Sequence, residues 1–170
     1  HNQYSGATAA EVASGFDICV ESLKSENVKI SYLEIGSAKG KSMALIGMLS
    51  KAHGAKFSGV SLDPYFDEAY IEGADQPDRF LNNEGTYTAP IDFSSREQAI
   101  ALWDKLNLQV QQIRETSTVG LEDLSKQGRT FNLIYIDGLH DGLTPITDFV
   151  GVVKLIESGG VIILDDRHLS

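Results

Sequence analysis

Basic residues, cysteine and long apolar runs are all scarce in this sequence. Lys and Arg total 14 against 24 Asp and Glu, so the formal net charge is −10. Nucleic-acid binding depends on Lys and Arg displacing counterions from phosphates, and this balance therefore argues against a DNA or RNA partner. The single Cys excludes an internal disulfide, and no stretch approaches the roughly 20 apolar residues of a membrane helix. We expect a soluble, cytoplasmic protein that acts on a small molecule, either as a monomer or as a homo-oligomer.

The 170 residues suit a single domain, in which helical and strand-like apolar patterns alternate. Helical spacing predicts helices over residues 8–24, 45–52, 95–106, 121–126 and 146–156, the last closed by Gly159-Gly160. Short apolar runs predict strands over residues 29–35, 56–62, 109–114, 131–136 and 161–164. This order predicts an α/β fold, a Rossmann-like, doubly wound and mainly parallel sheet with helices on both faces.

Residues 64–93 interrupt this alternation. They hold three of the four prolines and several aromatic residues, with weak periodicity. So long a stretch without regular structure is usually functional, and this one adjoins the ligand-binding edge of the predicted sheet. We expect it to form a loop or lid over the substrate, and we expect an N-terminal helix within residues 1–27.

Polar or acidic residues follow every predicted strand. In a doubly wound sheet, ligands bind beyond the carboxyl ends of the strands, so these residues are the candidates for a site. They are Glu34 to Ser42 after the first strand, Asp63 after the second, Glu115 to Ser117 after the third, Asp137 to His140 after the fourth and Asp165 to His168 after the fifth. Their recurrence at five strand ends indicates a common ligand-binding edge.

Two phosphate-binding motifs fail at the first of these turns. Gly40-Lys41-Ser42 looks like the end of a P-loop, but only three residues separate Gly36 from Gly40 where a P-loop needs four. The dinucleotide fingerprint fails as well, because Ala38 and Lys39 stand where glycines are required. A nucleoside triphosphatase is therefore disfavoured.

The turn does match the pattern acid-x-Gly-x-x-x-Gly, and from about residue 30 to its end the chain resembles the class I S-adenosylmethionine-dependent methyltransferases. It is most similar to small-molecule O-methyltransferases related to the macrocin and cephalosporin-tailoring enzymes. The matching segments are Leu33 to Gly36 with Gly40 and Ser42, Leu62-Asp63-Pro64, the Ile-Asp-Gly-x-His segment from Ile136 to His140, and Gly159 to Asp166 with its final Asp-Asp. The resemblance implies methyl transfer to a small hydroxylated molecule.

The resemblance also implies which residues bind the cofactor. Glu34 would meet its cationic amino group, and the turn amides with Ser37 and Ser42 would meet its carboxylate. Gly36 and Gly40 would let the backbone pass close to it. Asp63 would accept hydrogen bonds from the ribose hydroxyls, although it also suits a cap that ends a strand before Pro64. The family pattern has an Asp where Thr116 stands, so Thr116, Ser117 or the backbone would contact adenine.

A second constellation consists of Asp137, Asp165 and Asp166. Three neighbouring carboxylates repel one another unless a cation neutralises them, and Mg²⁺ or another divalent ion prefers such oxygen ligands. The resemblance places Asp137 beside the cofactor too, and assigns catalysis to Asp137 with His140 as the base. Alternatively, the acids are caps paired with Lys41 or Arg167, and His140 caps the following helix or bonds a carboxylate. His168 is a further candidate base or metal ligand.

Two other functions remain open on the sequence alone. One is a Rossmann oxidoreductase that uses NAD(P), although no Tyr-x-x-x-Lys or comparable motif is found. The other is a non-catalytic, methyltransferase-like module that binds a nucleoside or a partner chain. Methyltransferases of this class end in an antiparallel hairpin after the fifth strand, and we expect that hairpin to be missing here because the chain stops at Ser170.

Overall fold

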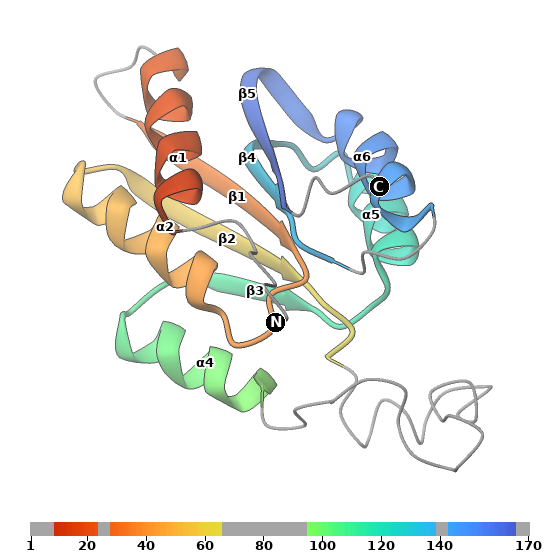
Figure 1. Ribbon diagram of the computed structural model, residues 1–170, viewed down its shortest axis with the longest axis horizontal. Helices are drawn as coiled ribbons and strands as arrows, with labels where there is room; N and C mark the ends of the chain where they lie inside the picture. The colour runs from red at the N-terminus through yellow and green to blue at the C-terminus, as the bar shows by residue number, and fades with distance from the viewer. Residues whose placement is uncertain (1–8, 24–27, 66–94, 139–142, 166–170) are drawn as a thin grey trace, which may run out of the picture.

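Five parallel strands form one sheet in the order β3-β2-β1-β4-β5 (Figure 1). The computed structural model describes residues 9–23, 28–65, 95–138 and 143–165. The strands are β1 (Lys29–Ile35), β2 (Lys56–Leu62), β3 (Val110–Ile113), β4 (Phe131–Ile136) and β5 (Ile156–Leu164). Central strand β4 is buried along its whole length, because helices cover both faces of the sheet. The predicted Rossmann-like α/β fold is confirmed.

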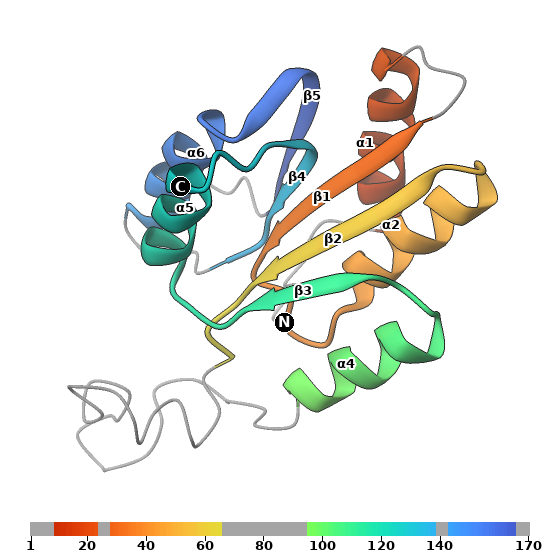
Figure 2. The same ribbon diagram turned by 180° about the vertical axis from the view of Figure 1, so that it is seen from behind.

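The helices divide between the two faces (Figure 2). On one face lie α1 (Ala9–Leu23), α2 (Lys41–Ala52) and α4 (Ser95–Lys105), and on the other lie α5 (Ser117–Lys126) and α6 (Thr144–Val153). Each face has its own apolar core. Phe16 and Met43 belong to the first core, and Leu124 and Val152 belong to the second.

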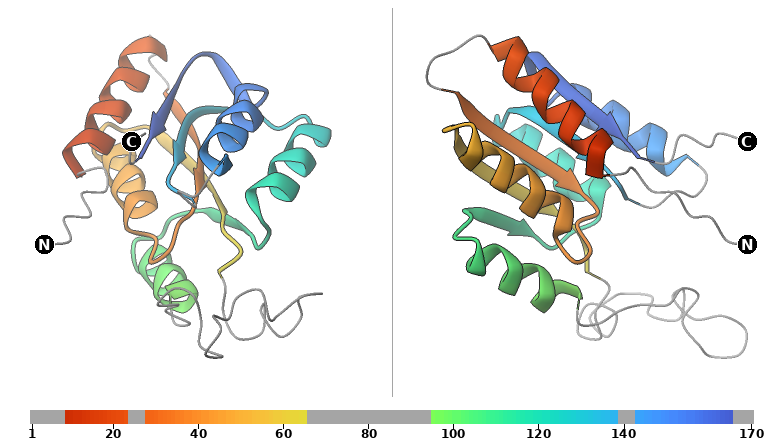
Figure 3. Two further views of the ribbon diagram at one scale, coloured as in Figure 1. Left: turned by 45° about the vertical axis from the view of Figure 1, so that its right-hand side comes forward. Right: turned by 60° about the vertical axis from the view of Figure 1, so that its left-hand side comes forward.

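The register of the sheet brings the strand ends to one level. Ile35 pairs with Leu62 on one side and with Ile136 on the other, and Ile136 pairs in turn with Leu164. The chain leaves β1 through α2 on one face and leaves β4 through α6 on the other (Figure 3). Connections that diverge in this way open a crevice at the carboxyl ends of β1 and β4, where ligands bind in doubly wound sheets.

Several predicted element boundaries are wrong. Helix α2 begins at Lys41 rather than at residue 45. Helix α5 begins at Ser117 rather than at residue 121, because Thr116 takes the extended N-cap conformation and the first turn holds no large buried side chain. Helix α6 ends at Val153, and Ile156 already pairs with Phe131 of β4. Gly159-Gly160 therefore does not close a helix. It lies within β5, where the pairing with β4 shifts register and Gly159 has a φ of 81°.

Several predictions fall outside the described residues. These are the lid beyond Tyr65, the base His140, the third acid Asp166, and His168. Among the helices that the structure describes, none combines the length and the apolar character needed to cross a membrane.

Candidate functional site

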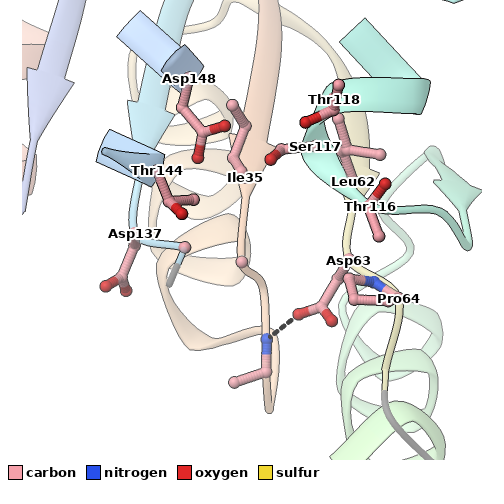
Figure 4. A pocket seen from close by; sticks show the side chains of 13 residues that line it. Ile35, Leu62, Asp63, Pro64, Thr116, Ser117, Thr118, Asp137, Thr144 and Asp148 are labelled. Atoms are coloured by element: carbon pink, nitrogen blue, oxygen red, sulfur yellow. Dashed lines mark hydrogen bonds between the residues drawn. The ribbon is translucent and has the colours of Figure 1, made fainter. Parts of the chain in front are cut away.

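A cavity of about 530 Å³ opens at the carboxyl ends of β1, β2 and β4 (Figure 4). Its volume lies within the range of pockets that enclose small molecules and cofactors. The starts of α5 and α6 face each other across it, with Thr116 and Ser117 on one side and Thr144 and Asp148 on the other. Gly36, Asp63, Thr116, Ser117 and Asp137 were all predicted as cofactor-binding residues, and all five line this cavity.

The turn after β1 depends on its two glycines. Gly36 has a φ of +80°, and a Cβ atom there would lie 2.1 Å from the backbone oxygen of Asp137. Gly40 has a φ of +71°, and a Cβ atom there would lie 2.6 Å from Nε1 of Trp103, which donates a hydrogen bond to the Gly40 carbonyl. Glycine is thus required at both positions because the turn packs closely against other parts of the protein. The turn is fixed between β4 and α4 before any ligand arrives.

Asp63 holds this turn against the end of β2. Its Oδ2 accepts hydrogen bonds from the backbone N–H groups of Ser37 at 2.7 Å and Ala38 at 2.9 Å. Figure 4 draws one of these two bonds. Its Oδ1 accepts from the backbone N–H of Tyr65 at 2.6 Å. The strand-ending role considered for Asp63 is therefore present in the structure. The same carboxylate lines the cavity, so it can also contact a ligand that binds there.

Glu34 is a fully buried acid beneath the turn. Its Oε1 accepts hydrogen bonds from the hydroxyls of Ser42 and Tyr32, whereas Oε2 has no hydrogen-bond partner among the described residues. Burial raises the pKa of Glu34 to about 7, although the hydrogen bond from Ser42 works in the opposite direction. The buried hydroxyl of Ser37 lies close to Glu34 and Tyr65 and lowers the pKa of both, but it forms no hydrogen bond of ordinary geometry with a described residue. Unpaired polar atoms of this kind are expected where a ligand completes the hydrogen bonding.

Asp148 is a site residue that the sequence analysis missed. It lies in the otherwise apolar helix α6, is only 2% exposed, and lines the cavity opposite Ser117. Burial raises its pKa, and a hydrogen bond with Ser117 partly offsets that effect. A single acid in an apolar helical segment was the signal that could have revealed it, because charged residues are rarely buried without a role.

Asp137 and Asp165 come together at the ends of β4 and β5. Burial raises the pKa of Asp137 to about 8, with further contributions from a hydrogen bond to Asp165 and from its charge. Within the described ranges, no group of three or more His, Cys, Asp or Glu side chains is placed to hold a metal ion, and the third predicted ligand, Asp166, lies outside them.

Comparison with known proteins identifies the family. A family model described as a methyltransferase domain matches residues 33–167, which is most of the chain. No curated protein matches the chain in sequence.

Three solved structures show the same architecture at low sequence identity. The rRNA methyltransferase aviRa from Streptomyces viridochromogenes has a TM-score of 0.53 and 13% identity, over 100% of this chain and 78% of its own. CalS11, a TDP-rhamnose 3'-O-methyltransferase of calicheamicin biosynthesis, has a TM-score of 0.53 and 13% identity, over 94% of this chain and 64% of its own. A SAM-dependent methyltransferase from Agrobacterium tumefaciens has a TM-score of 0.51 and 11% identity, over 91% of this chain and 44% of its own.

At these identities the likeness concerns the fold alone, and the chain spans less than two thirds of the second and third structures. The match to the family model, unlike the likeness in fold, identifies the family. The glycine turn, the acids at the strand ends and the cavity between them lie within the segment that the family model covers. The chain therefore belongs to the methyltransferase domain family, and it shares the fold of solved S-adenosylmethionine-dependent methyltransferases.

Proposed function

We propose that the protein is an S-adenosylmethionine-dependent O-methyltransferase that acts on a small hydroxylated molecule. The observation that carries this proposal is the cavity at the strand ends, which gathers Gly36, Asp63, Thr116 and Asp137 from four separate segments. Family membership supports methyl transfer, and the choice of donor rests on how these residues suit its parts.

Residues that line the cavity suit the nucleoside part of the donor, and the buried Glu34, which does not line the cavity, suits its methionine part. Asp63 suits the ribose hydroxyls, and Thr116 and Ser117 lie where adenine would be received. The unpaired Oε2 of Glu34 suits the ammonium group of the methionine part, because that cation would meet a buried acceptor that lacks a partner among the described residues. When bound, S-adenosylmethionine supplies an electrophilic methyl group on a sulfonium centre.

Asp137 and Asp165 fit a divalent metal ion. Two adjacent carboxyl groups offer the oxygen ligands that Mg²⁺ prefers, and a cation would offset the burial and the neighbouring charge that raise the pKa of Asp137. We propose that these two acids hold the ion together with Asp166. Such an ion would lower the pKa of an acceptor hydroxyl.

The protein has two tasks in the reaction. It would hold the acceptor hydroxyl next to the bound donor, which would supply the methyl group. It also removes the hydroxyl proton, and we assign that proton to His140 on the sequence argument. Asp137 lines the cavity, and we assign it to the point where donor and acceptor meet.

A small acceptor suits the charge of the chain better than a nucleic acid. The net charge of −10 disfavours a polyphosphate, even though one structure of similar fold is an rRNA methyltransferase. CalS11, which has a TM-score of 0.53 to this chain, is by its name a sugar O-methyltransferase.

The proposal is tested by transfer of a labelled methyl group from S-adenosylmethionine to catechol and to a sugar, with magnesium and with chelator. We expect methylated product with at least one acceptor, and at least a hundredfold loss in Asp137→Asn. The matched control is Asp123→Asn, an exposed acid of α5 that pairs with Lys126. Equal transfer by wild type and Asp137→Asn would contradict the assignment of Asp137. Equal transfer with magnesium and with chelator would contradict the metal.

A further inference from the structure

A second cavity, of about 350 Å³, is lined by the starts of α1 and α2. These two helices lie on the face of the sheet opposite to α5 and α6 (Figure 3). Asp137 lines both cavities, so they meet at the end of β4. The second cavity also holds Lys41, Tyr135 and Asp165, none of which lines the larger one. This arrangement places a separate binding space beside the proposed donor.

Methyl transfer needs two ligands whose reacting atoms touch. The larger cavity has the residues that suit a nucleoside. The smaller one has an apolar wall formed by Val12 and Leu45 and, among the described residues, no counterpart of Asp63 or Thr116. Ser42, which we assign to the methionine end of the donor, borders the smaller cavity and marks where the two ligands would adjoin. Two spaces that share the residue at the reaction centre fit a donor and an acceptor. The smaller space is therefore the better candidate for the acceptor.

The smaller cavity is polarised. Acidic residues Asp137 and Asp165 lie at the strand ends, and Tyr135 is hydrogen-bonded with Asp137. Lys41 lines the cavity from the first residue of α2, where the helix dipole disfavours a cation. No carboxylate of the described residues lies within ion-pair distance of Lys41. The side chain is exposed, so its ammonium group is open to an anionic ligand that enters the cavity.

We propose that this second cavity binds the methyl acceptor and that the acceptor carries a carboxylate or phosphate which pairs with Lys41. The inference rests on the proposed function and narrows its substrate class to small hydroxylated acids or phosphate esters. The reacting hydroxyl lies at the Asp137 and Asp165 end, the carbon skeleton packs on Val12 and Leu45, and the anion lies beside Lys41. Lys41 is a specificity-determining residue in this arrangement and takes no part in the chemical step.

The test compares acids with uncharged partners of similar shape. Binding of S-adenosylhomocysteine is measured first by calorimetry, with magnesium present. Under saturation with that compound, two pairs are titrated: 3,4-dihydroxybenzoate against its methyl ester, and glucose 6-phosphate against glucose. We expect the acid of at least one pair to bind five- to tenfold more tightly than its neutral partner.

Variants then test whether Lys41 causes the preference for the acid. Lys41→Met should abolish it without weakening binding of the neutral partner, and Lys41→Arg should retain it. Lys56→Met, an exposed lysine at the opposite end of the sheet, should leave it unchanged. Because the neutral partner must still bind to Lys41→Met, a variant that has lost its fold cannot produce this result.

Three results would overturn the inference. One is the absence of an acid preference in both pairs, and another is a preference that survives in Lys41→Met. The third is a Lys41→Met protein that binds S-adenosylhomocysteine more weakly but keeps its acid preference, since Lys41 would then pair with the carboxylate of the methionine part. A folded wild-type protein that binds no S-adenosylhomocysteine would instead contradict the proposed function itself, and with it the basis of this inference.

Discussion

At the scale of single residues, two acids have opposite relations to the stability of the fold. Asp63 stabilises it, because its carboxylate accepts three backbone hydrogen bonds that fix the turn after β1. Glu34 lies fully buried with one oxygen unpaired among the described residues, which opposes folding whenever the side chain is charged. The proposed donor would turn that cost into binding energy by offering Glu34 a cation.

Asp63→Asn should lower the free energy of unfolding by about 1–3 kcal/mol, the cost of leaving a buried donor unsatisfied. The amide oxygen can still accept from Ser37 and Ala38, but its NH₂ group would then face the N–H of Tyr65. Urea unfolding measures the change. The exposed control Asp123→Asn should change stability by less than about half a kcal/mol. Equal stability of both variants would show that the Asp63 contacts do not hold the turn.

Glu34→Gln should make the protein more stable above pH 7. The folded-state pKa of Glu34 is about 7 against an ordinary value of 4.5, so the folded state binds a proton that the unfolded state releases between these values. Stability therefore falls as the pH rises from 4.5 to about 7 and stays lower above that. Since a tenfold change in proton affinity is worth about 1.4 kcal/mol, the penalty reaches about 3 kcal/mol.

Urea unfolding between pH 4.5 and 8 checks this window, which follows from the pKa of Glu34. Glu34→Gln should make the pH dependence shallower, and the slope that remains comes from Asp137, whose pKa is also raised. The variant should at the same time bind S-adenosylhomocysteine more weakly, because the amide no longer offers an anion to the ammonium group. The exposed acid Glu21, changed to Gln, serves as control. A Glu34→Gln protein that is less stable than wild type at pH 8 would contradict the account.

At the scale of elements, the turn between β1 and α2 links three parts of the fold. It contacts β2 through Asp63, the end of β4 through Gly36, and α4 through the hydrogen bond from Trp103 to Gly40. A loop held from three sides is preorganised, so a ligand that binds to it loses little conformational entropy.

Gly36→Ala should destabilise the protein by about 2–4 kcal/mol and abolish ligand binding. About 1 kcal/mol of this comes from the left-handed backbone and the rest from overpacking against Asp137. Gly54→Ala is a matched control, because Gly54 has a φ of +68° but no described atom within 4 Å of the position that a Cβ atom would take. Both variants carry the cost of the left-handed backbone, and only Gly36→Ala carries the cost of crowding. Thermal unfolding of the two variants therefore separates these costs. Equal effects would mean that the close approach at Gly36 does not matter.

The sequence predicted the order of the elements but not all of their ends. Buried parallel strands such as β4 are recognisable because both faces are apolar. The start of β5 was missed because Ile156 fits both the helical spacing of α6 and a strand, and only its pairing with Phe131 decides between them. Asp148 was missed for a related reason, since its burial depends on how α6 packs beside α5. Local patterns cannot reveal contacts that tertiary packing creates.

At the scale of the whole molecule, the acidic charge limits the choice of partner. A net charge of −10 should prevent tight binding of RNA at physiological salt, because the chain would gain little from counterion release. Fluorescence anisotropy with a labelled RNA hairpin should therefore show no binding at micromolar protein. Submicromolar, salt-sensitive binding would contradict the preference for a small acceptor.

The site as a whole is built from strand ends that the parallel sheet brings to one level, and the central claim is that this edge binds S-adenosylmethionine. Calorimetric titration of S-adenosylhomocysteine into the wild-type protein and into Asp63→Ala tests that claim most directly. We predict one site of micromolar affinity in the wild type and at least a tenfold loss in the variant. A folded wild-type protein that releases no heat of binding, or an Asp63→Ala variant that binds equally well, would contradict it.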